Sequence, residues 1–160
     1  MTESSASSRP IELADAEGVD LSEATILLVD DNRQNLELMQ AYLEALPCTI
    51  ETVTDGVEAV EAIERNVPDL VLLDVMMPRM SGFEVCQKIK QSPATRDVVV
   101  IMVTALNEVG DYERAVECGT DDFLTKPVNK VELLTRVRSL VRVRLLKRRL
   151  ESLMDGRRDG

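Results

Sequence analysis

The sequence predicts an α/β protein built on a doubly wound, five-stranded parallel sheet. Short apolar runs, typical of strands buried on both faces of a sheet, recur along the chain. Stretches with the apolar spacing of amphipathic helices separate these runs. Parallel strands need such crossover connections, and right-handed crossovers place helices on both faces of the sheet.

The expected strands differ in strength. Three are nearly continuous apolar runs, and two are weaker, the first of which alternates like an edge strand. In chain order the expected strands are 24–29, 49–53 (the edge strand), 67–75, 97–103 and 121–124.

Four helices are expected between the strands, each marked by apolar residues at helical spacing. The marking residues are Leu36, Met39, Leu43 and Leu46 for the first, Val57, Val60 and Ile63 for the second, Phe83, Val85, Cys86 and Ile89 for the third, and Tyr112, Ala115 and Val116 for the fourth.

A fifth helix is expected to begin after Asn129, which can cap it, and to meet no helix breaker before Gly156. About 26 residues would make a rod of about 39 Å, longer than a compact domain of this class needs. Its first part offers a core face: Val131, Leu134, Val137 and Val141. Its second part has the 3-4-3 spacing of a short coiled-coil seam: Val143, Leu146, Leu150 and Leu153.

Charge divides the chain into parts. The formal net charge is −10, but residues 129–160 carry ten Lys+Arg against four Asp+Glu, whereas residues 1–128 carry nine against 25. We expect residues 1–23 to form an acidic, disordered extension, residues 24–142 to form the folded domain, and residues 143–160 to form a basic helical extension with a frayed end. The acidic body argues against nucleic acid or anionic membrane as a partner.

The composition excludes several function classes. The chain has no histidine, which removes Ser-His-Asp hydrolysis, imidazole zinc sites and histidyl phosphotransfer by the chain itself. Its three cysteines, Cys48, Cys86 and Cys118, are far apart and odd in number, which favours a reducing compartment over a disulfide framework. With no apolar run of ~18 residues and no secretory signal, we expect a soluble, cytoplasmic protein.

Polar residues follow four of the expected strands. Asp30 and Asp31 follow the first, Asp74 ends the third, Thr104 ends the fourth and Lys126 follows the fifth. Ligands of open α/β sheets bind beyond the carboxyl ends of the strands, so these side chains should meet at one edge. Three carboxylates in one place repel each other unless a cation neutralises them, and Mg²⁺ prefers oxygen ligands of this kind. The site therefore suits phosphoryl transfer.

Each of these residues also has an ordinary structural interpretation. Asp30 and Asp31 could belong to an N-cap before the first helix, Asp74 could be a turn residue, and Thr104 could be a plain strand end. The coincidence of suitable side chains at four strand ends favours a functional site.

Four motifs make the prediction more specific. ILLVDDNRQN (26–35), LVLLDVMMPRMSGFEV (70–85), VIMVTAL (100–106) and DDFLTKPVN (121–129) resemble, in order and spacing, the motifs of a response-regulator receiver domain. That family is the phosphoacceptor module of two-component signalling, and the resemblance covers about residues 24–142. It implies a flavodoxin-like fold with strand order 2-1-3-4-5.

The resemblance also implies roles for individual residues. Asp74 corresponds to the phosphorylated aspartate, which becomes an acyl phosphate. Asp31 corresponds to a direct ligand of Mg²⁺, for which Mn²⁺ could substitute, and Asp30 to a ligand acting mostly through water. The backbone carbonyl of Met76 is expected to be a further ligand.

Three further residues match the family's switch. Lys126 is expected to pair with Asp74 and later with a phosphoryl oxygen, and its bond to Pro127 is expected to be cis. Thr104 is expected to donate its hydroxyl to the phosphoryl group. Phe123 stands at the position of the switch aromatic, although an ordinary core ring is an equal alternative. We also expect Met76 and Leu106 to limit water access to the acyl phosphate and to slow its hydrolysis.

The resemblance implies a sensor histidine kinase or a histidine phosphotransfer protein as phosphodonor, since this chain has no histidine. We expect a homodimer through the face of the fourth helix, fifth strand and fifth helix, through the C-terminal helix, or through both. The C-terminal helix could instead be a connector to an output domain such as a diguanylate cyclase, or a cationic face for an acidic partner.

Two other functions compete with this switch. A Mg²⁺-dependent aspartyl-phosphate phosphatase requires a second acid two residues after the nucleophile. Met76 occupies that position here, which argues against this function. An unphosphorylated scaffold is disfavoured by the complete set of Asp30, Asp31, Asp74, Thr104 and Lys126. We therefore expect a phosphoacceptor switch that acts only on its own phosphorylation and hydrolysis, and not a turnover enzyme.

Overall fold

The computed structural model describes residues 19–105 and 109–159. Strands and helices alternate along the chain after a short 3-10 turn. The elements are η1 (Leu21–Glu23), β1 (Thr25–Val29), α2 (Arg33–Leu43), β2 (Thr49–Val53), α3 (Gly56–Arg65), β3 (Leu70–Asp74), α4 (Gly82–Gln91), β4 (Val99–Thr104), α5 (Val109–Cys118), β5 (Asp122–Thr125) and α6 (Lys130–Asp159). The greater part of the expected N-terminal extension, residues 1–18, and Leu106 lie outside the described residues.

The five strands form one parallel sheet in the order β2-β1-β3-β4-β5, which confirms the predicted fold class and strand order. β2 is an edge strand, as its alternation predicts. The register places Asp74 opposite Val103 and Thr104 opposite Thr125, so the carboxyl ends of β3, β4 and β5 lie side by side. This is the edge where the candidate side chains were expected to meet.

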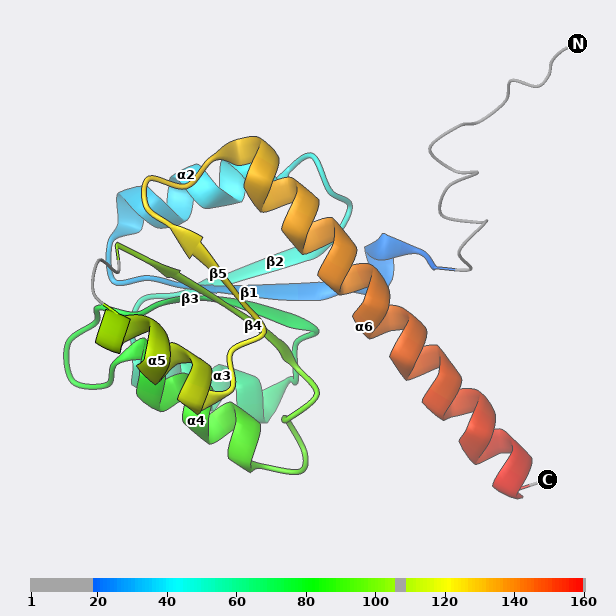
Figure 1. The fold of residues 1–160 in the computed structure, drawn as a ribbon. Coiled ribbons are helices and arrows are strands. Elements are labelled where there is room, and N and C mark those ends of the chain that lie inside the picture. The colour runs from blue at the N-terminus through cyan, green and yellow to red at the C-terminus, as the bar shows by residue number, and fades with distance from the viewer. Residues whose placement is uncertain (1–18, 106–108, 160) are drawn as a thin grey trace, which may run out of the picture.

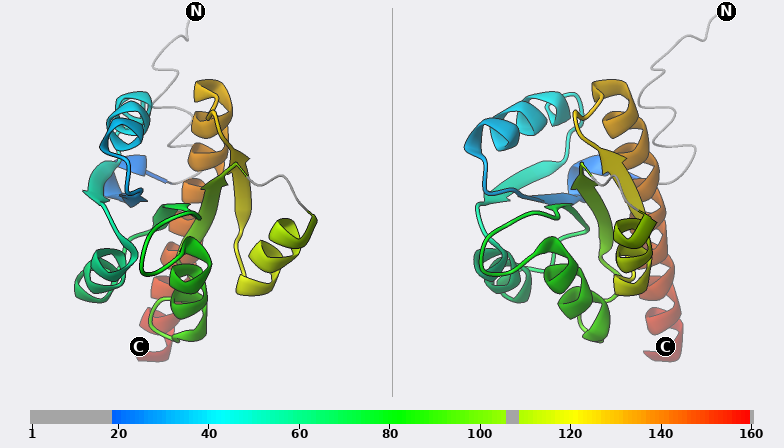
Figure 2. Two further views of the ribbon diagram at one scale, coloured as in Figure 1. Left: turned by 90° about the vertical axis from the view of Figure 1, so that its left-hand side faces the viewer. Right: turned by 60° about the vertical axis from the view of Figure 1, so that its left-hand side comes forward.

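Two helical layers enclose the sheet (Figures 1 and 2). α2 and α6 cover one face, and α3, α4 and α5 cover the other. The strand residues alternate between the two layers: Ile26 and Leu28 pack on the α2 and α6 side, whereas Leu27 and Val29 pack on the opposite side. The core is almost wholly aliphatic, as expected from a chain with two Phe, two Tyr and no Trp.

Side-chain caps fix where the helices begin near the strand ends. Asn32 caps α2 by accepting a hydrogen bond from the backbone N–H of Asn35, and Asp55 caps α3 in the same way through Glu58. Ser81 and Glu84 form a reciprocal capping box at the start of α4. Because Asn32 is the residue that caps α2, the carboxylates of Asp30 and Asp31 are not needed as helix caps.

Several residues predicted to mark core-facing positions are exposed instead. Val57 of α3, Val116 of α5 and Val131 of α6 all face solvent. The buried stripe of α6 begins at Leu133 and not at Val131. Its members are four residues apart and therefore lie on one side of the helix: Leu133, Val137, Val141 and Leu145. The expected stop at Gly156 is also wrong, since α6 continues to Asp159. A glycine in the last turn costs a helix only about 1 kcal/mol.

Ordered structure begins before the first strand. Val19 is buried in the α2 and α6 layer, and Asp20 caps η1 through the backbone N–H of Ser22. α6 continues well past the sheet at the end opposite the candidate site (Figure 1). η1 therefore lies beside α6 where that helix leaves the body.

Within the described ranges 19–105 and 109–159, no helix combines the length and the apolar character that a membrane crossing requires.

Candidate functional site

Three carboxylates meet at the carboxyl end of the sheet. Asp30 and Asp31 directly follow β1, and Asp74 is the last residue of the neighbouring strand β3. One carboxylate oxygen from each lies within 4.8 Å of the others. Asp30 and Asp74 are buried, at 1% and 3% exposure, whereas Asp31 faces solvent. The three acids predicted to share a site are therefore together, with one open side.

The loop between β1 and α2 holds Asp30 in place. Its Oδ1 accepts a hydrogen bond from the backbone N–H of Asn32 at 2.8 Å, and its Oδ2 accepts from Nδ2 of Asn35 at 3.4 Å. The backbone N–H of Asp30 donates to the carbonyl of Val53 on the edge strand at 3.3 Å. These contacts orient a buried carboxylate without neutralising its charge.

Lys126 supplies the nearest cation. Its Nζ lies 3.1 Å from Oδ1 of Asp74 and 3.5 Å from Oδ2 of Asp30. Burial would lower the pKa of Lys126, but the hydrogen bond and charge of Asp74, together with Asp30, raise it above its ordinary value. Burial and the charge of Asp30 raise the pKa of Asp74 to about 6, although Lys126 acts in the opposite direction. One ammonium thus contacts two carboxylates of a cluster of three.

This donor set fits a hard divalent cation. The three acids offer oxygen ligands close together, on a side of the site that Asp31 opens to solvent. Their negative charges repel each other, and Lys126 alone does not supply enough positive charge to neutralise them. Asp30, Asp31 and Asp74 are the side chains that would hold such an ion. The backbone N–H of Met76 hydrogen-bonds the Asp74 carboxylate, and the Met76 side chain is 75% exposed. The ligand role of the Met76 carbonyl stays a prediction.

Thr104 ends β4 with an unused hydroxyl. The residue is buried, and its Oγ1 has no hydrogen-bond partner among the residues that the structure describes. Its backbone carbonyl accepts from the N–H of Lys126 at 2.9 Å, which ties it to the same edge of the sheet. Leaving a buried hydroxyl unpaired costs about 1–3 kcal/mol, so an acceptor that reached Oγ1 of Thr104 would gain a hydrogen bond that the described residues do not supply.

Phe123 lies between the core and the surface. Its ring is partly buried against the cluster formed by α3, α4 and α5. It meets the ring of Tyr112 of α5 edge to face, with centroids 5.6 Å apart and planes at 76°. The ring is thus neither fully exposed nor a fully buried core residue, and its switch role stays a prediction. The Lys126–Pro127 bond is cis, as expected.

Sequence reasoning missed the role of Gly82, which looks from the sequence like an ordinary residue of the turn into α4. A Cβ added at this position would lie 2.3 Å from the carbonyl oxygen of Asp74 and 2.9 Å from Cα of Val75. The N-terminus of α4 therefore packs directly against the backbone of Asp74 and Val75. Only glycine, which has no Cβ, permits this close approach. A glycine eight residues after the central acid was the available signal.

A second missed residue is Asp69, which directly precedes β3 and is 4% exposed. It lies at the opposite end of that strand from Asp74. Its position before a continuous apolar strand was the only sequence signal.

Comparison with known proteins places this geometry in a family. The profile of the response regulator receiver domain matches residues 26–138. Response regulator PleD of Caulobacter vibrioides is 47% identical over 123 residues, which are 77% of this chain and 27% of PleD. The DNA-binding dual master transcriptional regulator RpaA of Synechocystis is 37% identical over 117 residues, covering 73% of this chain and 48% of RpaA. The chain spans less than half the length of each of these two relatives.

Solved structures resemble the same region. The signal receiver domain of a signal transduction histidine kinase from Syntrophus aciditrophicus has a TM-score of 0.70 and 38% identity, covering 74% of this chain and 89% of that domain. The receiver domain of sensor histidine kinase PA1611 from Pseudomonas aeruginosa, solved with a magnesium ion coordinated in its active site cleft, has a TM-score of 0.68 and 32% identity, covering 74% of this chain and 97% of that domain. With the predicted motifs, fold and strand-end carboxylates all in place, the chain belongs to the response regulator receiver domain family.

Proposed function

We propose that this chain is a phosphorylation-driven switch in which Asp74 accepts the phosphoryl group. A carboxylate oxygen of Asp74 attacks phosphorus, the bond from phosphorus to the donor's histidine nitrogen breaks, and an acyl phosphate forms on Asp74. The observation that carries the proposal is the composition of the site: a buried strand-end carboxylate with two acids, one lysine and a hydroxyl that has no hydrogen-bond partner among the described residues. The magnesium-containing receiver of PA1611 supports it by similarity.

Mg²⁺, or Mn²⁺ in its place, would be held by Asp30, Asp31, Asp74 and the backbone carbonyl of Met76. Such an ion supplies neutralisation of the charge that gathers on the phosphoryl oxygens during transfer. Asp30 is already oriented for this by Asn32 and Asn35. Lys126 supplies the remaining positive charge at the same point.

The switch itself would use the residues around the acyl phosphate. Lys126 can exchange its contact with Asp74 for one with a phosphoryl oxygen, since both are anionic acceptors. Thr104 gains the acceptor that its hydroxyl now lacks. Movement of Thr104 makes room for Phe123, whose ring already lies at the rim of the core beside Tyr112. The change would reach the face formed by α5, β5 and α6.

The partners follow from the chemistry. The donor would be a sensor histidine kinase or a histidine phosphotransfer protein, because the chain has no histidine of its own. We expect action in the cytoplasm, no direct contact with nucleic acid or membrane, and no turnover of a small molecule. Output would pass through a homodimer at the α5, β5 and α6 face, through α6, or through both. Receivers occur in relatives as different as PleD and RpaA, which favours a switch module over an activity of its own.

Beryllofluoride, a stable analogue of the acyl phosphate, tests this proposal. We expect wild type to bind it only with Mg²⁺ present and to change its mass in solution, measured by light scattering. Asp74→Ala should abolish both effects. Asp97→Ala, which removes an exposed carboxylate at the other end of the sheet, is the control and should bind normally. A wild type that binds no beryllofluoride in saturating Mg²⁺ would overturn the proposal.

A further inference from the structure

A second charged cluster lies at the end of β3 opposite Asp74. Asp69 is buried, and its Oδ2 accepts a hydrogen bond from the backbone N–H of Thr25, the first residue of β1, at 3.0 Å. Its Oδ1 accepts a charged hydrogen bond from Nη1 of Arg148 at 2.6 Å. Nε of Arg144 lies 3.5 Å from the same oxygen. Both arginines belong to α6, so one carboxylate joins the base of the sheet to the C-terminal helix.

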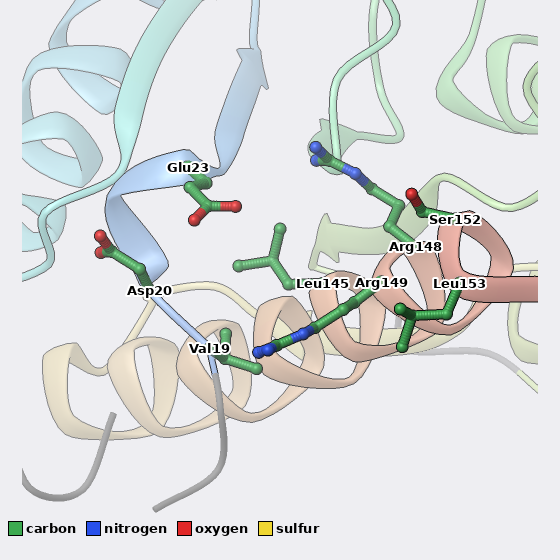
Figure 3. A pocket seen from close by; sticks show the side chains of 8 residues that line it. All are labelled: Val19, Asp20, Glu23, Leu145, Arg148, Arg149, Ser152 and Leu153. Carbon is green, nitrogen blue, oxygen red and sulfur yellow. The ribbon is translucent and has the colours of Figure 1, made fainter. Parts of the chain in front are cut away.

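Neighbouring cations of α6 face further acids of the body. Nζ of Lys147 lies 3.2 Å from Oδ1 of Asp97, and this hydrogen bond lowers the pKa of Asp97. Arg148 and Arg149 line a groove of about 520 Å³ together with Asp20 and Glu23 of the N-terminal turn, as Figure 3 shows. Three cations within residues 144–149 thus contact two carboxylates of the body, Asp69 and Asp97, and Arg149 lines the same groove as Asp20 and Glu23.

The apolar contacts of α6 end where this ionic cluster lies. The buried stripe of the helix closes with Val141 and Leu145, and Leu145 packs in the same layer as Val19. The large apolar residues of the extension lie on roughly the opposite side of the helix and are 38% to 58% exposed. They are Val143, Leu146, Leu150, Leu153 and Met154, of which Leu153 also lines the groove beside Leu145. Leu145 is thus the last core residue of α6, and beyond it the contacts of the helix with the body are mainly ionic.

We propose that Asp69 anchors the extension of α6 to the receiver body and sets its direction. We call Asp69, Arg144 and Arg148 the Asp69 anchor. The positive charge of Arg144, Lys147 and Arg148 is then used within the chain instead of being offered to an acidic partner or to nucleic acid. The anchor fixes the direction in which the exposed stripe Val143, Leu146, Leu150 and Leu153 points.

Burial makes Asp69 the main residue of this cluster. A buried carboxylate that loses its cations is left as an uncompensated charge, whereas an exposed pair contributes little. Asp69 is the buried member, and Asp97 and Lys147 are both largely exposed. Arg148 makes the shorter contact, while Nε of Arg144 has no hydrogen-bond partner among the described residues. Asp69 and Arg148 should therefore carry most of the anchoring.

The anchor is independent of phosphorylation. Asp69 and Asp74 stand at opposite ends of β3, and none of the anchor contacts involves Asp30, Asp31, Thr104 or Lys126. A failed anchor would thus leave beryllofluoride binding intact, and a failed phosphoacceptor would leave the anchor intact. The two proposals can be tested separately in the same full chain.

Amide hydrogen exchange of the full chain, read by mass spectrometry, tests the anchor. Asp69→Asn keeps an oxygen to accept from Thr25 but removes the charge that holds the arginines. A released helix of this length is marginal in water, so its amides should open. We expect exchange over residues 146–155 to rise at least about tenfold, which corresponds to about 1.4 kcal/mol. Arg148→Gln should act in the same direction, and it leaves Arg144 beside the buried Asp69.

Two controls separate anchoring from general destabilisation. Asp97→Asn removes the exposed neighbouring pair and should raise exchange over 146–155 less than about twofold. Amides of β1, β3 and β4 should keep wild-type exchange in Arg148→Gln, and beryllofluoride binding should be unchanged. Wild-type exchange over 146–155 in both Asp69→Asn and Arg148→Gln would overturn the proposal. An increase in Asp97→Asn equal to that in Arg148→Gln would also overturn it, because Asp69 would then have no special role.

Discussion

The two ends of β3 carry buried aspartates in opposite surroundings. At the carboxyl end, Asp74 shares its site with Asp30 and Asp31 against the single ammonium of Lys126, and we call this group the Asp74 site. At the other end, Asp69 meets two arginines and a backbone N–H. The Asp74 site is short of positive charge, whereas Asp69 has two guanidinium groups of the same chain beside it. Each end also has one buried polar atom without a hydrogen-bond partner among the described residues, Oγ1 of Thr104 at the first and Nε of Arg144 at the second. A cluster short of positive charge is suited to binding a cation, and a carboxylate with its own cations is suited to holding structure.

The difference assigns separate tasks to the two ends of one five-residue strand. The carboxyl end would receive an ion and a phosphoryl group. The other end fixes the helix that leaves the domain. Substitutions at the two ends should therefore differ in sign and in dependence on divalent ions, and the following predictions use that contrast.

The largest effect is expected from shortening α6 at two points. A stop after Val141 removes the buried Leu145 and takes both arginines, Arg144 and Arg148, away from Asp69. We expect a loss of about 3–5 kcal/mol in the free energy of unfolding, measured in urea. A stop after Arg149 keeps the anchor and should cost less than about 1 kcal/mol. Equal losses from both stops would show that the anchor contributes nothing.

The same two chains test the exposed stripe. Both lack Leu150 and Leu153, so both should lose any dimer held by the C-terminal helix, as measured by light scattering. A dimer that survives in the chain ending at Arg149 would instead point to the α5, β5 and α6 face.

Asp→Asn substitutions at the two ends should have opposite signs. In EDTA, Asp74→Asn removes one of three clustered charges and should raise the free energy of unfolding by about 1 kcal/mol. Asp69→Asn should lower it, because its arginines lose their counterion. Mg²⁺ should stabilise wild type by mass action but not Asp74→Asn to the same degree. Thermal unfolding with and without Mg²⁺ measures all three, and a destabilised Asp74→Asn in EDTA would contradict the contrast.

Two buried threonines provide a smaller matched comparison. Thr95 Oγ1 donates to the carbonyl of Ile89 at 2.7 Å, whereas Thr104 Oγ1 has no partner among the described residues. Thr95→Ala should cost about 1–2 kcal/mol, and Thr104→Ala should be neutral or stabilising. Thr104→Ala should nevertheless weaken beryllofluoride binding. A loss of stability in Thr104→Ala as large as in Thr95→Ala would show that its hydroxyl is already paired.

The smallest effect is expected at Met76. Its side chain is 75% exposed beside the three acids and can shield the acyl phosphate from water. Met76→Asn should speed hydrolysis less than about tenfold, a difference below about 1.4 kcal/mol in the barrier. Val116→Asn, at an exposed position of α5, is the control. An unchanged rate of dephosphorylation in Met76→Asn would exclude the shielding.

The sequence predicted most of the Asp74 site because strand ends converge in a parallel sheet. Asp30, Asp74, Thr104 and Lys126 were located by the boundaries of apolar runs alone, and the motifs then added roles. The errors fall on helix faces, where one apolar residue at the right spacing is weak evidence. Val131 fitted the apolar spacing expected of a core-facing helix position. In the structure, however, Leu133 lies on the side of α6 that faces the core and Val131 does not.

The Asp69 anchor could not be predicted, because its contacts are long-range and ionic. Arg148 meets Asp69 across 79 positions of the chain, and the neighbouring Lys147 meets Asp97 across 50. No local pattern pairs such residues, so the basic stretch looked equally suited to an external partner. Gly82 was undervalued for a similar reason, since its contact is with the backbone of another element.

The most direct test of the central claim is intact-mass spectrometry of the full chain after incubation with acetyl phosphate. We expect wild type to gain the mass of one phosphoryl group in Mg²⁺ and none in EDTA, with fragmentation placing the group on Asp74. Asp69→Asn should gain it as well, since the Asp69 end of β3 takes no part in the transfer. Modification of Asp74→Ala to the same extent as wild type, or failure of wild type to be modified in Mg²⁺, would contradict the assignment of the Asp74 site.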